Sequence, residues 1–368
     1  MNKKLIAVAI AGACAVPAAM AQTAGPVTLY GRVYLTAVSV EAKANTTSGS
    51  PEIARKSRID DQSSLLGVRG TEDIGGGMKA FFQLETGFNA TQAPTCNTAQ
   101  AASGTFGCGT GFAGRNSGVG VQSGWGSVLA GRWDTPYKVS TYPIDAFGDL
   151  TMAAISGLGH DQGNFDRRDQ NQIEYWSPDW AGFAFKLMWQ TNFQKTATTN
   201  PYDQGANITY TKGPLYLMYA YEEHKDPSPS YKKESGNSLG GTFSFGPIKI
   251  GAEYEQIRRV SATVAPDPKD RKELLANIIW TVGNNQFIYQ YQDSKDGGAN
   301  TSGAVQPECN SNTLAYKYVF TKRTFFIAQY MKTDNKNAGT CSFGTTATFP
   351  VKAGNDVDAF DIGLQHVF

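Results

Sequence analysis

The feature that most constrains this 368-residue chain is the alternation of apolar and polar side chains with a period of two. From Val27 onward the sequence divides into about sixteen such stretches. Residues two apart lie on the same face of a strand, so each stretch predicts a β-strand with one apolar face. The clearest examples set Phe183, Phe185, Leu187 and Trp189 against Ala184, Lys186, Met188 and Gln190, and Ile248, Ile250, Ala252 and Tyr254 against Lys249, Gly251, Glu253 and Glu255.

The connections between these stretches alternate between short turns and long loops. Hairpin turns are predicted at Gly124-Trp125-Gly126, Lys212-Gly213-Pro214, Gly246-Pro247 and Gly283-Asn284-Asn285. The long connections cover 39–56, 91–112, 135–169, 193–205, 225–237, 259–273, 294–311 and 333–357, all on one side. A soluble β-sandwich also alternates, but it distributes loop lengths less regularly. The pattern predicts an all-β fold, a 16-stranded antiparallel transmembrane β-barrel with short periplasmic turns and long extracellular loops.

Closure of the barrel has a physical reason. An unpaired sheet edge in lipid would leave backbone N–H and C=O groups unsatisfied, at several kcal/mol each, so the first and last strands must pair. A ring of about sixteen strands encloses a lumen too wide for side chains alone to fill. Either a water channel or an inserted segment must therefore occupy the lumen.

The N-terminal segment has the order of a secretory signal. Lys3 and Lys4 precede an apolar run from Leu5 to Val16, and small residues surround the predicted cleavage site after Ala21. We predict a signal peptide at 1–21 and a single barrel domain at 22–368, since no linker or composition break divides the chain. Lipidation at Cys14 is the alternative, which the short stretch before it disfavours. The net charge of +1 gives no basic excess that would indicate a nucleic-acid partner.

Four cysteines follow the signal segment, in a compartment that permits oxidation. Cys96 and Cys108 lie in one predicted loop, and Cys309 and Cys341 lie in two neighbouring loops. We predict the disulfides Cys96–Cys108 and Cys309–Cys341. Metal binding is the alternative, but no CxxC pair or adjacent histidine supports it.

Several motifs, in order along the chain, carry a family resemblance. They are Val27-Thr28-Leu29-Tyr30-Gly31-Arg32-Val33, Leu66-Gly67-Val68-Arg69-Gly70-Thr71-Glu72-Asp73, Gly75-Gly76-Gly77-Met78-Lys79-Ala80, the segment 115–121, Leu129-Ala130-Gly131-Arg132, Tyr175-Trp176-Ser177-Pro178 and Gly363-Leu364-Gln365-His366-Val367-Phe368. Their order and spacing resemble the Gram-negative general porins, especially the β-proteobacterial branch. The likeness spans the whole chain after the signal segment, although no single motif is decisive.

The resemblance implies a homotrimer in the outer membrane, embedded in lipid and lipopolysaccharide, in which each barrel passes ions and small hydrophilic solutes passively. It also implies that the third long loop, 135–169, folds inward and narrows the pore. This loop carries Asp145, Asp149, Asp161 and Asp166. Its unusual length independently suits a segment packed inside a barrel, and a surface lid is the alternative.

Porins place arginines on the wall that faces the inner loop. By motif position the candidates are Arg115, Arg132 and Arg168, and we expect Arg32, Arg69 and Lys79 to line the same wall. Facing rows of opposite charge would filter solutes by a transverse field. Two departures leave the ion preference open: Leu65 stands where many relatives carry another arginine, and alternation from Val119 does not point Arg115 inward. A substrate-specific porin for an anion, a sugar or a nucleoside is the alternative function.

Other polar residues give no catalytic or cofactor site. We interpret Glu85, Glu174, Glu253 and Glu255 as solvated lumen carboxylates, with calcium at loop carboxylates left open. The three histidines, His160, His224 and His366, lack a nearby serine elbow, so we predict neither an enzyme nor a cofactor. A soluble adhesin is a further rival, distinguished by independence from detergent.

Aromatic residues near the strand ends predict two interfacial girdles. The candidates are Tyr30, Trp133, Trp176, Trp180, Trp189, Trp280 and Phe368. Phe368 closes a half-apolar strand, with Phe360, Ile362, Leu364 and His366 on its face. This pattern resembles the signal read by the barrel-assembly machinery, so Phe368 is also predicted to act as an assembly signal.

Overall fold

The computed structural model describes residues 27–44, 49–91, 112–148, 151–154, 164–229, 231–262, 270–295, 308–336, 339–342 and 351–368. Among these residues no helix is long and apolar enough to cross a membrane. The elements are β1 (Val27–Ala42), β2 (Ile53–Asp61), β3 (Leu65–Gly75), β4 (Met78–Gly87), β5 (Ser117–Ser123), β6 (Gly126–Asp134), α2 (Pro136–Thr141), β7 (Arg168–Trp176), β8 (Phe183–Gln190), β9 (Tyr202–Lys212), β10 (Leu215–Ser228), β11 (Tyr231–Phe245), β12 (Ile248–Ser261), β13 (Arg271–Val282), β14 (Asn285–Lys295), β15 (Glu308–Val319), β16 (Thr324–Lys336) and β17 (Val357–Val367).

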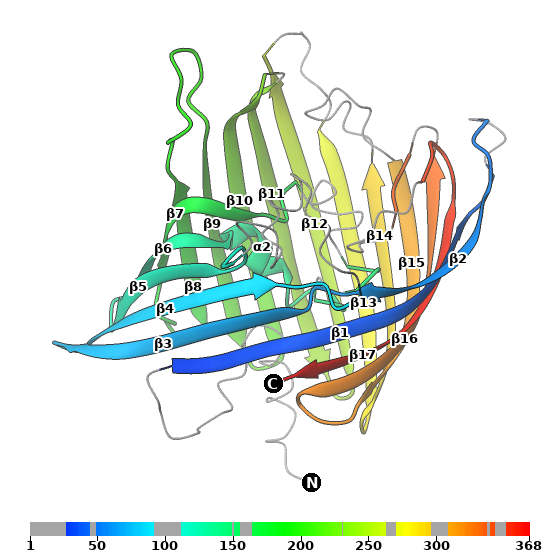
Figure 1. Cartoon of the computed structure of the whole chain (residues 1–368), viewed down its shortest axis with the longest axis horizontal. Coiled ribbons are helices and arrows are strands. Elements are labelled where there is room, and N and C mark those ends of the chain that lie inside the picture. The colour runs from blue at the N-terminus through cyan, green and yellow to red at the C-terminus, as the bar shows by residue number, and fades with distance from the viewer. Residues whose placement is uncertain are drawn as a thin grey trace.

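The strands form one closed antiparallel ring (Figure 1). β1 pairs with β17 from Arg32 opposite Val367 to Ala42 opposite Val357, and this pairing closes the barrel. The other edge of β1 pairs with β2 along one length and with β3 along the next, so β2 and β3 together occupy one position of the ring. The predicted 16-stranded antiparallel β-barrel is confirmed.

A short break separates β2 from β3. Ser63 has a φ of 62°, a left-handed conformation that is unusual for a residue other than glycine. Side chains stabilise this bend, because Ser64 Oγ accepts a hydrogen bond from Tyr34 N at 3.0 Å and Asp61 Oδ1 accepts one from Ser64 N at 2.8 Å. Alternation gives no sign of this break.

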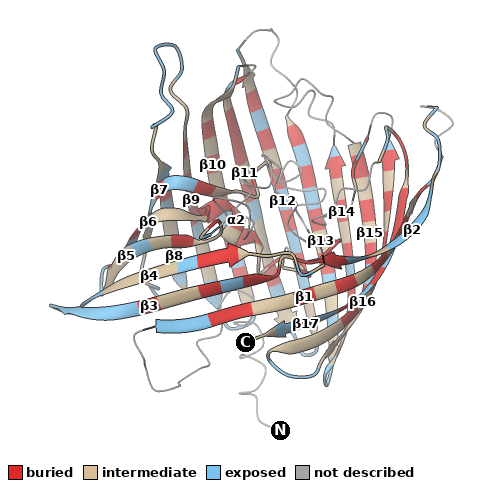
Figure 2. Cartoon of the chain, in the orientation of Figure 1, coloured by how far each residue is buried: buried red, intermediate tan, exposed pale blue. Residues whose placement is uncertain are grey.

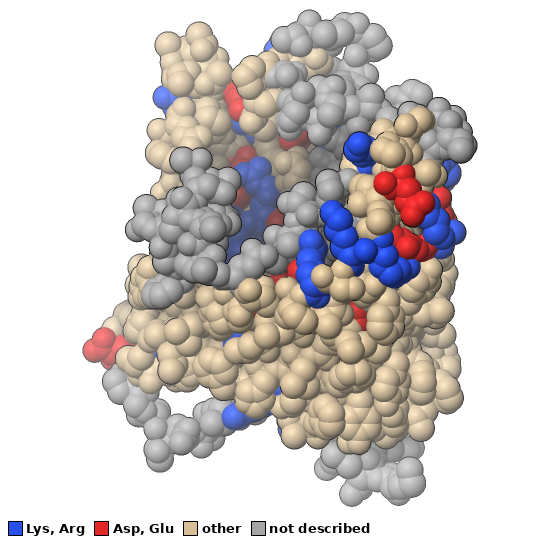
Figure 3. Space-filling view, turned by 45° about the vertical axis from the view of Figure 1, so that its right-hand side comes forward, with Lys and Arg blue, Asp and Glu red and all other residues tan. Residues whose placement is uncertain are grey.

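The outer face of the ring is apolar and the inner face is polar. Leu187, Trp189 and Ile250 are exposed on the outside, whereas Met188 and Glu253, on the alternate positions, are buried inside. Buried and exposed residues alternate along the strands in Figure 2. Figure 3 shows a broad band of the outer surface with few charges, and Lys, Arg, Asp and Glu gathered above it. Such a band suits hydrocarbon.

The short turns lie at the predicted places. Gly213, Gly246 and Gly283 adopt φ values of 58°, 57° and 60°, which residues with a side chain rarely take. At the other end of the barrel, one predicted long loop is wrong. The region 225–237 continues the strands, because β10 and β11 leave only 229–230 between them. The residues of this region are mostly polar, so the ladder continues there without an apolar face that alternation could reveal.

The predicted aromatic girdles are placed only in part. Trp180, Trp189 and Trp280 are exposed near the ends of their strands, as an interfacial position requires. Tyr30 is instead buried inside the barrel, so its assignment to a girdle is wrong. Trp176 contacts Trp133 at 5.5 Å between ring centroids.

Cys309 and Cys341 form the predicted disulfide, with their Cα atoms 6.4 Å apart. Asn335 holds the second cysteine in place: Asn335 Oδ1 accepts from Cys341 N at 2.8 Å, and Asn335 Nδ2 donates to Cys341 O at 2.9 Å. The bridge joins β15 to the segment that follows β16. Cys96 and Cys108 lie outside the described residues, so their pairing stays a prediction.

We expect a double C309A/C341A substitution to lower the thermal stability of the barrel. A cross-link over a sequence separation of 32 stabilises by at most about 3–4 kcal/mol in the loop-entropy account. The measurement is the temperature at which the folded band converts to the slower, unfolded band in SDS gels. Equal conversion temperatures for the wild type and the double variant would contradict a stabilising role, and non-reducing peptide mapping checks the pairing itself.

Phe368 extends the closure of the ring. Phe368 N donates to Gly31 O at 3.0 Å, and Gly31 N donates to Phe368 O at 3.1 Å. A Cβ on Gly31 would lie 2.5 Å from Phe368 Cζ, so the glycine makes room for the phenyl ring. Both hydrogen bonds and this ring contact lie on the seam between the first and last strands.

Deleting Phe368 should reduce the yield of folded barrel severalfold in membranes, because the deletion removes both seam hydrogen bonds. F368Y, which keeps the ring and the backbone groups, is the matched control. Folded protein is measured by the heat-modifiable band in outer-membrane fractions. A normal yield for the deletion variant would remove the role of Phe368 in assembly.

Candidate functional site

The connection from β6 to β7 enters the barrel as a helical turn. Thr135 accepts a hydrogen bond from Lys138 N through Oγ1 at 3.3 Å and so caps α2, and Pro136 occupies its first turn. The cap ends β6 abruptly and redirects the chain toward the lumen. In Figure 1, α2 lies inside the ring, and it contacts β8, β9 and β10.

Polar side chains of the inner wall bind the backbone of this loop. The donors and acceptors are Asn207 Nδ2 to Pro136 O (2.6 Å), Tyr216 Oη to Ser140 O (2.6 Å), Lys249 Nζ to Pro143 O (2.6 Å), Asn277 Nδ2 to Ile144 O (2.7 Å), and Gln290 Nε2 and Gln292 Nε2 to Ala153 O (2.9 Å each). These donors come from β9, β10, β12, β13 and β14. They satisfy carbonyls that would otherwise be buried without partners. The predicted inward fold of 135–169 is therefore confirmed for its described residues.

Apolar contacts fix the loop at two further places. Ile144 packs against Met218 and Leu275, and all three are buried. Phe147 and Met152 join a larger buried cluster that spans β1 and β14 to β17. The loop thus follows the inner wall from β9 to β16 and covers it.

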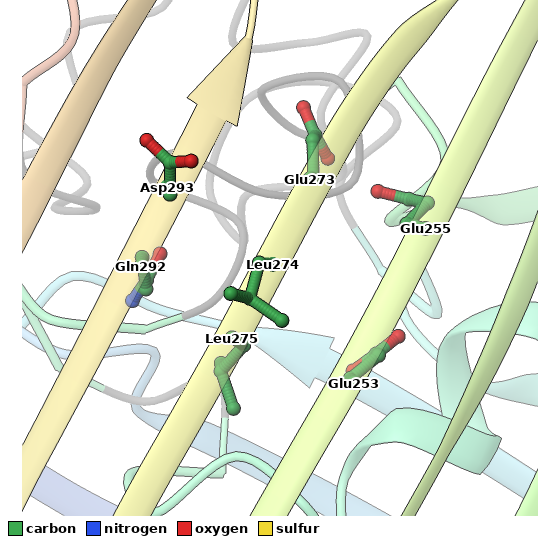
Figure 4. A pocket seen from close by; sticks show the side chains of 7 residues that line it. All are labelled: Glu253, Glu255, Glu273, Leu274, Leu275, Gln292 and Asp293. Atoms are coloured by element: carbon green, nitrogen blue, oxygen red, sulfur yellow. The ribbon is translucent and has the colours of Figure 1, made fainter.

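A group of carboxylates lies under the loop. Figure 4 shows Glu253 and Glu255 on β12 beside Glu273 on β13, around a small cavity of about 10 Å³. Tyr137 donates to Glu255, and Ser238 Oγ donates to Glu253 at 2.6 Å. Burial and the Glu255 carboxylate raise the pKa of Tyr137 well above its usual value, which keeps the phenol protonated as a donor.

The interpretation of these glutamates as solvated lumen carboxylates is wrong. Glu85, Glu174, Glu253 and Glu255 are all buried, with exposed fractions between 1% and 7%. Glu253 and Glu255 are covered by the loop, and Glu174 accepts from Trp176 Nε1 at 2.5 Å. Alternation assigned them correctly to the inner face, but it carries no information about what packs over that face.

Arg115 is held by Glu85 on the wall that the loop leaves uncovered. Arg115 Nε lies 2.7 Å from Glu85 Oε1, and Tyr30 Oη donates to the other carboxylate oxygen at 3.1 Å. Gly67 allows this arrangement, because a Cβ there would lie 2.2 Å from Tyr30 Cζ. The structure thus places Arg115 beside the lumen-facing Glu85, in an ion pair that the sequence analysis did not predict.

Arg168 is part of a second network, at the root of the loop. Arg168 Nη2 lies 2.7 Å from Asp134 Oδ1, and Arg168 Nε donates to Asn116 Oδ1 at 2.7 Å. Asn116 Nδ2 in turn donates to Asp134 Oδ2 at 2.7 Å, and Lys138 Nζ lies 2.8 Å from Asp166 Oδ1. Asp134, Asn116 and Lys138 were missed from the sequence, although Asp134 follows the motif that ends in Arg132.

Arg132 differs from the other two arginines. Val128 and Ala130 are exposed, so strict alternation would point Arg132 outward, but the register with β7 shifts between Gly131 and Trp133. Arg132 is half-buried and interacts electrostatically with Arg168 and with two acidic residues, Asp134 and Asp169. Its Nε has no hydrogen-bond partner, and across the described part of the chain it forms no ion pair.

The three remaining basic candidates lie on the same wall, nearer the short turns. Arg32 Nε donates to Ser63 O at 2.9 Å. The guanidinium of Arg69 lies 5.0 Å from the centroid of the Tyr30 ring. Lys79 is exposed, pairs with Asp73 on β3, and is the second residue of β4 after the short turn.

The acidic candidates are less well placed. Asp145 is buried, and its Oδ1 accepts from Phe147 N at 3.0 Å within the loop itself. Asp149 and Asp161 lie outside the described residues. In the described part of the chain, no group of three or more His, Cys, Asp or Glu side chains is arranged to hold a metal ion. The role of the loop carboxylates at the constriction stays a prediction.

The two walls of the lumen differ in exposure. Along β9 to β14 the inner-face side chains that contact the loop are buried, apart from the partly exposed Lys249, whereas Arg32, Arg69, Arg115, Arg132 and Arg168 keep part of their surface accessible. Figure 3 shows a hollow at the long-loop end with Lys and Arg side chains inside it. The open part of the lumen therefore lies between the loop and a basic wall.

Known proteins are similar to this chain in sequence and in fold. Outer membrane porin protein 32 of Delftia acidovorans is 26% identical over 398 aligned positions that cover all of both chains. The major outer membrane protein P.IB of Neisseria gonorrhoeae is 24% identical over 88% of this chain and 91% of its own. An anion-selective porin from Comamonas acidovorans superimposes with a TM-score of 0.75 at 22% identity, over 93% of this chain and 99% of its own.

A second solved structure extends the likeness in fold. OmpT of Vibrio cholerae, in a trimer form, superimposes with a TM-score of 0.60 at 15% identity, over 93% of this chain and 99% of its own. The sequence profile described as Gram-negative porin matches residues 7–338. With a match over most of its length and a closed barrel narrowed by an inner loop, the chain belongs to the Gram-negative porin family.

Proposed function

We propose that this outer-membrane porin passes ions and small hydrophilic solutes by passive diffusion through a throat between the inner loop and the wall from β1 to β7. The difference in exposure between the two walls carries the proposal. The loop seals the wall from β9 to β16, and the basic side chains opposite remain in contact with water. No step of this function requires a cofactor or a covalent reaction.

The throat filters by charge and by polarity. Fixed ion pairs such as Arg115–Glu85 and Arg168–Asp134 present oriented dipoles to the passing solute. A polar solute can exchange part of its hydration for these groups, whereas an apolar solute cannot. The predicted role of Asp145 and Asp149 as the opposing acidic row belongs to the same proposal.

Anion preference is the second candidate function. The unpaired guanidinium of Arg132 in the throat favours it, since a fixed positive charge raises the local concentration of anions. The solved porin from Comamonas acidovorans described above is named as anion-selective. A specific sugar or nucleoside site has no such supporting feature among the described residues.

Features of the barrel also support the proposed partners of this protein. A homotrimer is supported by the trimer form of the Vibrio cholerae neighbour. The apolar outer band supports contact with membrane lipid, and charged residues above it support contact with lipopolysaccharide. The seam contact of Phe368 supports recognition of the last strand by the barrel-assembly machinery.

R132Q should lower the chloride-to-potassium permeability ratio about twofold or more, because it removes an unpaired positive charge from the throat. The measurement is the reversal potential of single channels in planar bilayers under a tenfold KCl gradient. K322Q, in the exposed turn before β16, is the matched control and should leave the ratio unchanged. An unchanged ratio in R132Q would remove Arg132 from the filter.

E85Q should change the same ratio in the opposite direction. The substitution keeps a hydrogen-bond acceptor for Arg115 but removes the charge that neutralises it, so anion permeability should rise about twofold. The reversal potential again provides the measurement, after the heat-modifiable band has shown that the variant folds. A fall in anion preference would contradict the placement of Arg115 on the pore wall.

A further inference from the structure

The charges of the lumen are distributed unevenly along its axis. The ion pairs of the inner face lie toward the long-loop end, where the strands leave the lipid. They include Arg115–Glu85 (2.7 Å), Arg168–Asp134 (2.7 Å), Arg167–Asp203 (2.9 Å), Arg259–Glu234 (2.8 Å) and Arg271–Glu273. In each of these pairs a carboxylate at contact distance balances the positive charge, whereas Arg132, near the end of β6 in the same half, forms no ion pair with the described residues.

Toward the short-turn end, three cations of the inner face lie over aromatic rings. Arg69 lies over Tyr30 (5.0 Å to the centroid), Lys186 over Trp176 (4.6 Å) and Lys317 over Phe325 (4.0 Å). Lys186 follows the turn before β8 by a few residues, and Lys317 stands two residues before the end of β15. These three pairs come from separate sectors of the ring.

Lys317 is the clearest case. The alternate residues Thr313 and Ala315 are buried on the inner face, so Lys317 shares that face. Phe325 beneath it is held by the edge of Tyr34, at 5.5 Å between ring centroids. Within the described ranges Lys317 forms neither an ion pair nor a hydrogen bond.

An aromatic face holds a cation without cancelling its charge. The ring quadrupole attracts the ammonium group at short range, but it carries no net charge, so the positive field persists at larger distances. A carboxylate at 2.7 Å, in contrast, turns the pair into a dipole whose field falls off quickly. Arg69 and Lys317, neither of which has a carboxylate partner among the described residues, therefore contribute a positive potential to the short-turn half of the lumen.

We propose that the short-turn half of the lumen is an anion vestibule, in which Arg69 and Lys317 attract multivalent oxyanions of the phosphate type. The proposal rests on the channel function proposed above and adds that the two ends of the channel differ in charge. At the long-loop end the cations other than Arg132 described above are held by contact carboxylates, whereas Arg69 and Lys317 in the vestibule have no carboxylate partner among the described residues. Conductance should therefore depend on the sign of the voltage, and inorganic phosphate should act differently from the two sides.

The test uses single channels of the full protein in planar bilayers with 0.1 M KCl on both sides. Currents at equal positive and negative voltages should differ by about 1.5-fold, and millimolar inorganic phosphate should reduce the current more from one side than from the other. At 1 M KCl the Debye length falls to about 3 Å, so both asymmetries should shrink. The ratio of the larger to the smaller current is the same for either direction of insertion, because a reversed channel only exchanges the voltage sign that gives the larger current.

Substitutions at Lys317 and Arg69 test whether these residues cause the asymmetry in current and in phosphate block. K317Q and R69Q should each bring the current ratio closer to one, and the double variant should abolish the sidedness of phosphate. K317R, which keeps the charge over the ring, should retain both asymmetries, as should K322Q in the exposed turn. Symmetric wild-type currents, or asymmetry that survives in the double variant, would overturn the vestibule and leave the channel function intact. Folded wild-type protein that gives no current would overturn the proposed function and the vestibule with it.

Discussion

Every backbone hydrogen bond within the lipid must be made inside the protein, and the rest of this structure depends on that constraint. The seam between β1 and β17 satisfies it, since eleven residue pairs join the two strands from Arg32 to Ala42. Gly31 and Phe368 extend the seam by two further hydrogen bonds. Closure fixes which face of each strand contacts lipid, and therefore fixes alternation as the dominant pattern of the sequence.

The size of the ring then creates a second requirement. A lumen this wide cannot be filled by wall side chains, so the β6–β7 connection enters it and brings backbone carbonyls into a region that the protein encloses. These carbonyls need donors, which the amides of Asn207, Asn277 and Gln290 supply. The polar character of the wall from β9 to β14 is thus explained by the loop it binds more than by the water in the pore. On the opposite wall the basic residues keep part of their surface accessible.

Alternation and turn chemistry were sufficient to predict the barrel, its strand number and its short turns, whereas the inward loop was predicted from the family resemblance and the length of the connection. These patterns did not predict the features that depend on contacts other than those with lipid. The strands β10 and β11 continue through 225–237, where mostly polar residues carry no apolar alternation, and the bend at Ser63 depends on side-chain hydrogen bonds that have no period. The disulfide of Cys309 and Cys341 was predictable from loop proximity. The burial of Glu255 was not, because it depends on Tyr137, which is 118 residues away in sequence.

The electrostatic potential in the pore depends on which cations form ion pairs with carboxylates, and the number of charged residues alone does not give it. Arg115 and Arg132 are both arginines of the same wall, yet one is bound to Glu85 across two strands and the other has no carboxylate partner among the described residues. Sequence motifs assign both to the wall with equal weight, because the register that brings Glu85 to Arg115 forms only in the folded ring. A field that acts on a solute over many ångströms comes from the unpaired charges, while the paired ones mainly hold the throat in shape. Selectivity in such a barrel is therefore determined by which cations lack a carboxylate, and the places where they lie on aromatic rings are where that field persists.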